Sequence, residues 1–204
     1  MTEDKNRISV AAYDAWYKVH AVEFENEVAC LKSFFTEGFG ADIGCGTGRF
    51  TSALKIKLGL DISFPMLSFA SYKIKYPVQA DAHSLPFSDS SLDFILSVTL
   101  MCFLDDPKSV LKEFCRVIKP GGYLLLGHLD SASPAGLKLE SEKSSHHYLS
   151  KAAFLPTRKL LNWIEKLEPE KIQVGQTLFN EPSDKNKMSD GFGAGFFNAI
   201  RADF

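Results

Sequence analysis

The sequence predicts an α/β fold in which a mostly parallel sheet is covered by helices. Short apolar runs of strand length alternate with segments of helical periodicity, which is the pattern of parallel sheets flanked by helices. A glycine-rich turn, ADIGCGTGRF at residues 41–50, follows the first of these runs, where open α/β sheets bind their ligands. The 204 residues, 45% of them hydrophobic, suit one globular domain spanning residues 1–204.

The N-terminal part of the chain is predicted to be helical. Apolar residues between Tyr13 and Phe35 recur largely at three- and four-residue steps, which predicts an amphipathic helix or a pair of helices ended by Gly38. We call residues 1–38 the N-terminal helical cap, because they precede the first predicted strand.

Short apolar runs predict the strands of the sheet. The runs expected to form parallel strands are FGADI, LKIKLGLD, PVQAD, LDFILSVT and YLLLGHL. Two more runs, IQVGQTLF (172–179) and FFNAIRA (196–202), lie on either side of a polar stretch and predict a closing antiparallel pair.

Capping residues mark the predicted helix starts. Ser63 stands shortly before Pro65, and Asp106 directly precedes Pro107, as is typical of helix N-termini. The helix after Asp106 is predicted to end at KPGG (119–122), and Thr157 is predicted to cap a further helix. The apolar face of the helix after Asp106 is expected to consist of Val110, Leu111, Phe114, Val117 and Ile118.

Residues 130–156 show no clear period, because Ser, Lys and Glu interrupt it. This segment follows the last regular parallel strand, so one interpretation is a lid or a substrate-facing insertion. The other interpretation is an irregular connection, and the sequence leaves both open.

Composition limits the classes of partner. The 23 basic and 25 acidic residues are well mixed and leave a net charge of -2, so no nucleic-acid partner is expected. The four cysteines are widely spaced, without the Cys/His spacing of a zinc site, and we expect free thiols and no metal. No signal peptide and no apolar run long enough to span a membrane is apparent, so a cytoplasmic location is expected.

The glycine-rich turn excludes two common nucleotide motifs. A dinucleotide fingerprint would need glycine at positions 44, 46 and 49, and position 49 is Arg49. A phosphate-binding Walker loop would need a following GK[ST], which is absent. The remaining pattern is acidic-x-Gly-x-Gly-x-Gly, led by Asp42.

An adenosyl ligand without a pyrophosphate suits this pattern. Asp61 ends the second strand run, where a carboxylate can accept both ribose hydroxyls, and Ile62 beside it can pack on a purine. Asp81 ends the third run, where it can accept from the adenine amino group while the Ala82 amide faces a ring nitrogen. Aspartates at three successive strand ends therefore predict an adenosyl site.

The motifs ADIGCGTGRF, LDIS, QADAHSLPFSDSSLDFI and KPGGYLLLG resemble those of the class I S-adenosylmethionine-dependent methyltransferases. The resemblance is to the type 11 branch, which includes ubiquinone- and menaquinone-biosynthesis-like enzymes, and covers roughly residues 10 to 130. It implies a Rossmann-like sheet of seven strands, mostly parallel with an antiparallel last strand, and helices on both faces. Only GRFTSAL separates the turn from the next strand, so the first helix after the turn should be short.

The resemblance also implies roles for particular residues. The backbone of Thr99, after the fourth strand, should reach the methionine moiety of the cofactor, and Tyr13 stands where the family has an aromatic residue near the cofactor. The other cofactor contacts that the family implies are Asp42, Gly44, Cys45 and Gly46 for the methionine end, Asp61 and Ile62 for ribose and adenine, and Asp81 and Ala82 for adenine.

Methyl transfer from S-adenosylmethionine to a small-molecule acceptor is the predicted function. The Asn-Pro-Pro-Tyr motif of amino-directed base methyltransferases is absent, and Cys102 lacks the Pro-Cys context of carbon-5 enzymes. The alternative is a non-catalytic module or partner subunit that binds S-adenosylmethionine or S-adenosylhomocysteine.

Residues that could serve the acceptor are harder to identify. No motif identifies a general base, although His128, at the end of the fifth strand, is a candidate. Candidate acceptor contacts are Trp16, His146 and Tyr148, with packing onto the sheet or a solvated loop as the alternatives. The oligomeric state is not predicted.

Overall fold

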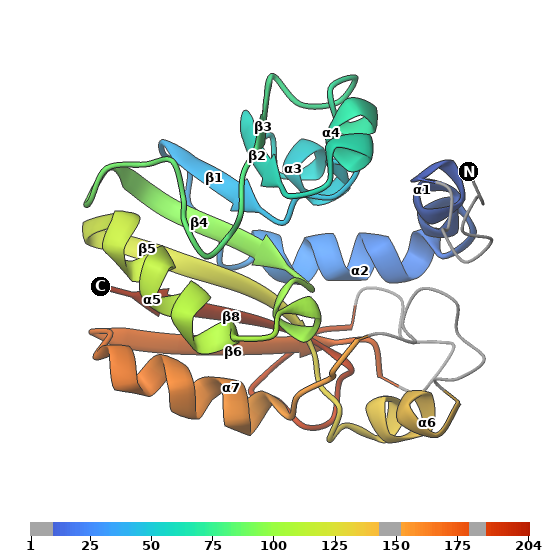
Figure 1. The fold of residues 1–204 in the computed structure, drawn as a ribbon. Coiled ribbons are helices and arrows are strands. Elements are labelled where there is room, and N and C mark those ends of the chain that lie inside the picture. The colour runs from blue at the N-terminus through green and yellow to red at the C-terminus, as the bar shows by residue number, and fades with distance from the viewer. Residues whose placement is uncertain (1–9, 143–151, 180–186) are drawn as a thin grey trace.

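The computed structural model describes residues 10–142, 152–179 and 187–204, and its central element is an eight-stranded sheet (Figure 1). The strands are β1 (Gly40–Ile43), β2 (Leu58–Asp61), β3 (Tyr76–Gln79), β4 (Leu92–Val98), β5 (Ile118–Leu129), β6 (Lys171–Thr177), β7 (Ser189–Asp190) and β8 (Phe197–Asp203). The helices are α1 (Val10–Val19), α2 (Ala21–Lys32), α3 (Arg49–Ala53), α4 (Phe64–Ala70), α5 (Pro107–Val117), α6 (Pro134–Glu142) and α7 (Thr157–Ile164), with 3-10 turns η1 (Met101–Phe103) and η3 (Glu165–Leu167).

The strand order is β3-β2-β1-β4-β5-β8-β6-β7. Strands β1 to β5 run parallel, and β8 lies antiparallel between β5 and β6. The predicted α/β fold, with its mostly parallel sheet and its closing antiparallel pair, is confirmed. The predicted number of seven strands is one too few, because Ser189 and Asp190 pair with Gln176 and Gly175 at the sheet edge. A two-residue strand in a polar stretch leaves no periodic signal.

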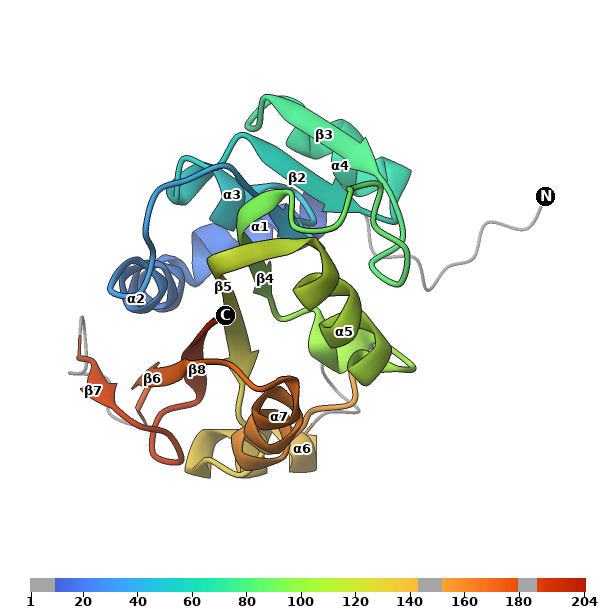
Figure 2. The same ribbon diagram turned by 90° about the vertical axis from the view of Figure 1, so that its left-hand side faces the viewer.

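Helices cover both faces of the sheet, as predicted. On one face α5 and α7 pack on the sheet through Phe114, Leu160 and Ile164, and on the other α2 and α3 pack through Leu31 and Phe50. Figure 2 shows α2 and α5 on opposite sides of β4 and β5. The alternation of side chains along each strand explains both faces, since successive residues of β5 enter opposite cores.

The predicted helix starts agree with the structure at two of three positions. Ser63 caps α4, and its Oγ accepts from the Met66 amide. Asp106 caps α5, and its Oδ1 accepts from the Ser109 amide. The N-terminal segment forms two helices, α1 and α2, as the helix-pair prediction allowed; α2 ends at Lys32 rather than near Gly38.

Two further local predictions are wrong. Thr157 is the first residue of α7 and not its cap; instead the Asp130 carboxylate accepts from the Thr157 amide at 3.0 Å. Helix α5 ends at Val117, and KPGG lies within β5, where the pairing with β4 shifts register. Part of the segment 130–156, for which the sequence left a lid and an irregular connection open, forms α6, whose polar residues hide its helical period.

Candidate functional site

A cavity of about 350 Å³ lies at the carboxyl ends of β1, β2 and β4. We call it the first cavity. The arrowheads of β1 and β4 point toward the end of the molecule where α1 lies (Figure 1). Eight of the ten predicted cofactor residues line this cavity, namely Tyr13, Asp42, Gly44, Cys45, Gly46, Asp61, Ile62 and Thr99.

The turn between β1 and α3 needs its glycines. Gly44, Gly46 and Gly48 have φ angles of 75°, 53° and 75°, in the left-handed region that side chains disfavour. A Cβ at Gly44 would also stand 2.9 Å from a methyl group of Leu100. The amides of Gly44 and Cys45 both donate to the Leu60 carbonyl at 2.8 Å, so the turn is held against β2. Its backbone is therefore bare on the cavity side.

The Asp61 carboxylate is fixed at the wall of the first cavity. Its Oδ2 accepts from the Gly46 amide and its Oδ1 from the Ser63 amide, both at 2.8 Å. A carboxylate has about four acceptor positions, so each oxygen can still accept a hydrogen bond from a ligand. The two backbone amides therefore fix the Asp61 side chain and leave positions on both oxygens where a ligand can donate hydrogen bonds.

Asp42 carries an oxygen without a partner among the described residues. Its side chain is buried, and its Oδ2 accepts from the Thr51 hydroxyl at 2.6 Å. No described residue donates to its Oδ1, which is also buried. Burial, with the nearby Asp61 charge, raises the pKa of Asp42 to about 7. A buried carboxyl group with an unpaired oxygen and a raised pKa is suited to a ligand that brings a hydrogen-bond donor or a positive charge.

Thr99 has a strained backbone at the end of β4. Its φ of 54° is in the left-handed region, which a β-branched residue rarely adopts. The Thr99 amide donates to the Gly127 carbonyl at 2.8 Å, and the Cys102 thiol donates to the Thr99 carbonyl at 3.1 Å. These contacts keep the strained residue in the wall of the cavity. Strain of this kind is concentrated at functional sites.

Helix α1 covers the glycine turn. Tyr13 is half-buried, and its ring lies 3.8 Å from the position that a Cβ of Gly46 would take. The Tyr13 and Tyr17 hydroxyls are 3.1 Å apart. Burial raises the pKa of both phenols, so they stay neutral near pH 7. Tyr13 and Tyr17 therefore form a neutral roof over the first cavity.

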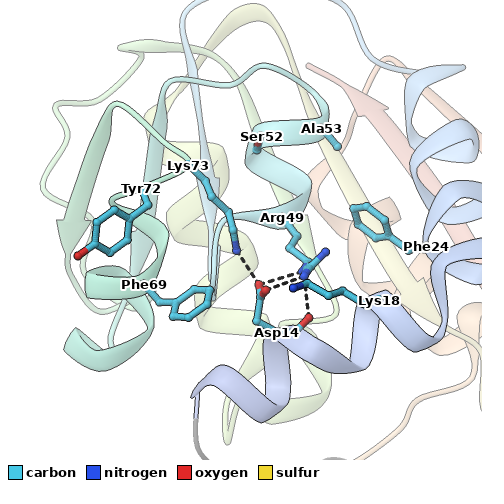
Figure 3. Close-up of a pocket in the computed structure, with 9 residues that line it drawn as sticks. All are labelled: Asp14, Lys18, Phe24, Arg49, Ser52, Ala53, Phe69, Tyr72 and Lys73. Carbon is cyan, nitrogen blue, oxygen red and sulfur yellow. Dashed lines mark hydrogen bonds and ion pairs between the residues drawn. The ribbon is translucent and has the colours of Figure 1, made fainter.

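An ion-pair cluster fastens α1 to the turn (Figure 3). Arg49 contacts the Asp14 carboxylate through Nε at 2.9 Å and Nη2 at 2.6 Å, and donates to the Asp14 carbonyl as well. Lys73 Nζ lies 2.6 Å from the same carboxylate and donates to the Thr47 carbonyl. The hydrogen bonds from Arg49 and Lys73 hold the pKa of Asp14 down at about 2, against the effect of burial. Arg49, which stands where a dinucleotide fingerprint would have its third glycine, therefore serves to link α1 to the turn.

Some predicted residues lie away from the first cavity. Neither Asp81 nor Ala82 lines it, and the exposed Asp81 carboxylate accepts from the amide and ring of His83. His128 lines neither this cavity nor the one described below; it is buried, and its Nε2 donates to the Leu155 carbonyl at 2.8 Å. Burial lowers its pKa. His146 lies outside the described residues, as does Tyr148.

Several cavity residues were missed in the sequence. Tyr17 stands one helical turn after Tyr13, a spacing that could have indicated a shared face. Thr51 does not line the cavity but holds Asp42, and it carries no such signal, because the two meet only when α3 packs beside β1. The remaining lining residues, to which the sequence analysis gave no ligand contact, are Thr47, Arg49, Phe50, Ser63, Met66, Val98, Leu100 and Phe103.

In residues 10–142, 152–179 and 187–204, no group of His, Cys, Asp and Glu side chains is arranged to hold a metal ion. No helix in this part of the chain has the length and apolar character needed to cross a membrane.

Fold and site together define the class: an open α/β protein whose ligand cavity lies at the carboxyl ends of its parallel strands. A family model described as "Methyltransferase domain" matches residues 41–126. A crystal structure from Thermotoga maritima, described as a SAM-dependent methyltransferase and possible histamine N-methyltransferase, is 38% identical with a TM-score of 0.90, over 95% of each chain. The protein belongs to the S-adenosylmethionine-dependent methyltransferases of class I and is an enzyme of that family.

Two further relatives differ in the share of their length that matches this chain. An uncharacterized protein of Methanocaldococcus jannaschii is 34% identical over 193 residues, 94% of each chain. A malonyl-[acyl-carrier protein] O-methyltransferase of Marinomonas is 33% identical over 160 residues, which are 71% of this chain and 59% of that enzyme. The family implies S-adenosyl-L-methionine as the cofactor.

Proposed function

We propose that the protein transfers the methyl group of S-adenosylmethionine to a small-molecule acceptor and holds the cofactor in the first cavity. The observation that carries this proposal is the buried Oδ1 of Asp42, which lacks a donor among the described residues and lies in the same cavity as the fixed Asp61 carboxylate. A ligand with an ammonium group and a ribose diol would supply hydrogen-bond donors to both aspartates.

The proposed roles follow from these contacts. Asp42 and the turn from Gly44 through Cys45 to Gly46 would hold the methionine end, together with the backbone of Thr99. Asp61 would accept from the ribose hydroxyls. Ile62, which is 66% exposed at the cavity wall, would pack on the adenine.

The adenine amino group needs an acceptor from β3. The Ala80 amide donates to the Asp61 carbonyl at 3.2 Å, so the chain that leads to Asp81 and Ala82 runs beside the ribose acceptor. We keep these two residues as the proposed adenine contacts. For Asp81 this requires the oxygen that His83 does not occupy.

When bound, S-adenosylmethionine supplies an activated methyl group, so the protein mainly has to align the reactants and exclude water. Tyr13 and Tyr17 cover the first cavity from α1, and Arg49 ties α1 to the glycine turn. This arrangement would keep the two tyrosines in a fixed position over the bound cofactor. His128 is not in this arrangement, because it lines neither cavity.

A small acceptor is supported by the size of the neighbouring space. A second cavity, of about 270 Å³, shares part of its wall with the first. The relative from Thermotoga is described as a possible histamine N-methyltransferase and the one from Marinomonas as an acyl-carrier-protein O-methyltransferase, so relatives with different acceptors share the fold. Histamine is the first acceptor to try. A place in the ubiquinone- and menaquinone-biosynthesis-like branch stays a prediction.

We further propose that residues 1–204 act as one domain in which two segments cover the acceptor. These are the N-terminal helical cap, residues 1–38, and the segment 130–156. Tyr13 and Trp16 of α1 and Leu139 of α6 all line the second cavity, which supports this arrangement.

A thermal-shift panel tests the proposal. S-adenosylhomocysteine should raise the melting temperature by binding the native state, whereas NAD should not, since Arg49 takes the fingerprint position where dinucleotide-binding proteins have glycine. Stabilisation by NAD but not by the adenosyl ligand would contradict the proposal. Transfer of a labelled methyl group to any small acceptor would separate an enzyme from a binding module.

A further inference from the structure

The second cavity lies between α1, α2 and the strand ends, next to the first. Its wall includes Trp16 from α1, His20 from the junction between α1 and α2, and Leu139 from α6. The two cavities share Tyr13, Tyr17, Thr99 and Phe103. A molecule in the second cavity therefore lies against the same side chains as a ligand in the first.

Glu27 of α2 carries a buried carboxyl group at the wall of the second cavity. It is only 7% exposed, yet it lines the second cavity. No described residue makes a hydrogen bond or an ion pair with its carboxyl group. The buried carboxylate of Asp14, by contrast, contacts two cations. Burying a carboxyl group without partners is costly, so its retention at a cavity wall points to a ligand.

The rest of the cavity is aromatic and carries acidic groups. The Trp16 and His20 rings are stacked at 4.0 Å between centroids, and Trp16 is partly exposed. His20 Nδ1 donates to the Trp16 carbonyl at 3.0 Å, which fixes the stack. Glu23, one turn before Glu27, also lines the cavity. No lysine or arginine of the described ranges lines it. Aromatic rings with carboxylates and no competing cation suit an organic cation.

We propose that the second cavity binds the methyl acceptor as a small organic amine, with the Glu27 carboxylate as the counter-ion of the ammonium group and the acceptor of its proton. This inference rests on the proposed function, since it names the acceptor class of the same site. The Trp16 ring packs on the organic part of the amine. Glu23 at the cavity wall adds negative charge that draws the cation in.

The proton balance of the reaction requires such a group. A protonated amine has no lone pair, so its proton passes first to a Glu27 carboxylate oxygen, which leaves a neutral amine and a neutral carboxylic acid. The cofactor supplies the methyl group: the new N–C bond forms as the S–C bond breaks, and that electron pair stays on sulfur. The methylated nitrogen then carries the positive charge, and no further reactant is needed.

The titration of Glu27 agrees with this role. Burial, and secondarily the charge of Glu23, raises its pKa to about 8. The other titratable groups that act on it or line the same wall are Tyr13, Tyr17, His20, Cys30 and Cys102. A base with a pKa near the working pH can both take a proton and release it.

The first experiment compares head groups on one skeleton. Calorimetry measures binding to the protein saturated with S-adenosylhomocysteine, using phenethylamine, 2-phenylethanol and phenylacetate, and the same three head groups on imidazole and short alkyl skeletons. At least one amine should bind about tenfold more tightly than its matched alcohol and carboxylate, which is the scale of an added charge-assisted hydrogen bond. If no amine exceeds its matched partners, the inference is wrong.

The second experiment changes the carboxyl group alone. Glu27→Gln keeps the shape and should weaken binding of the preferred amine about tenfold or more, while its affinity for S-adenosylhomocysteine stays within about threefold. Glu25→Gln is the matched control, because Glu25 lies on the same helix, is exposed and lines neither cavity. Equal amine affinity in Glu27→Gln and the parent would overturn the proposal.

Two readouts separate this inference from the proposed function. If S-adenosylhomocysteine binds and the amines do not, only the acceptor class is wrong. If S-adenosylhomocysteine itself does not bind, the proposed function fails. Should Glu27→Gln fold poorly, carbon-13 NMR of the Glu27 carboxyl in the parent replaces it: the amine should lower its pKa, and an unchanged titration counts against the proposal.

Discussion

Arg49 and Asp14 join α1 to the glycine turn through two contacts between the guanidinium group and the carboxylate, at 2.9 and 2.6 Å. Figure 3 shows the pair together with Lys73, which reaches the same carboxylate. Tyr13 directly precedes Asp14 and lies over Gly46, so we expect this ion pair to hold the tyrosine in place. The cluster is therefore expected to affect both stability and ligand binding.

We expect Asp14→Ala to lower the free energy of unfolding by about 2 to 4 kcal/mol, because it leaves two largely buried cations without their partner. Urea unfolding of mutant and parent measures this. Lys18→Ala is the control, since Lys18 lies beside this cluster (Figure 3) but is not one of the two cations paired with Asp14. Because the pKa of Asp14 is lowered to about 2, its contribution is present above pH 4 and disappears as pH falls toward 2.

Asp61→Ala should weaken binding of S-adenosylhomocysteine by about 1.5 to 3 kcal/mol, the scale of hydrogen bonds to a charged group. The loss should be similar for S-adenosylmethionine, because the ribose is common to both ligands. Calorimetry on folded protein measures it, with Asp105→Ala as an exposed control outside the cavity. Unchanged affinity would remove Asp61 from the cofactor site.

Affinity for S-adenosylhomocysteine should rise with pH between about 5.5 and 7. The pKa of Asp42 in the free protein is raised to about 7, so below this pH the carboxyl must lose its proton before it can pair with the ligand ammonium. The affinity should therefore fall by up to about tenfold for each pH unit below 7. Calorimetry in buffers of different ionisation enthalpy should detect proton release.

Thr51→Val offers the matched test of this pH dependence. The Thr51 hydroxyl donates to Asp42 and holds its pKa down, so the mutant should need a higher pH for the same affinity. A pH profile that is flat in both proteins would show that Asp42 does not face the ammonium group.

The stability of the free protein should decrease as pH rises from about 4.5 to 8. Glu27 has a folded pKa of about 8 against a usual value of 4.5, so unfolding releases a proton throughout this range and is favoured by higher pH. Each unit of pKa difference corresponds to about 1.4 kcal/mol. Thermal unfolding should show a smaller decrease in Glu27→Gln, and Glu25→Gln should follow the parent. Parallel curves for all three would mean that Glu27 is ionised normally.

Limited proteolysis should detect ordering of the two covering segments. We expect S-adenosylhomocysteine to slow cleavage within residues 1–25 and 130–156, because closure over the ligand excludes water and protects the backbone. Mass spectrometry of early fragments identifies the cleaved bonds. Equal cleavage rates with and without ligand in both segments would contradict the proposed closure.

Much of the first cavity could be predicted because its determinants are local. Gly44, Gly46 and Gly48 are needed by the turn itself, and Asp42 and Asp61 stand at the ends of apolar runs that can only be strands. Parallel strands bring their carboxyl ends to one edge, so these residues meet whatever the rest of the chain does. The sequence by itself therefore determined the fold class and the ligand-facing turn.

The residues of the second cavity come together only through the tertiary structure. In AVEFENEVACLK, Glu27 is one of three glutamates on one helix and looks no different from Glu23 or Glu25. It is buried only in the folded protein, where α2 packs on α1 and on β5, β6 and β8. The same holds for Arg49 and Asp14, which are 35 residues apart. A side chain's burial and its long-range partner depend on how elements pack, and local spacing carries no information about either.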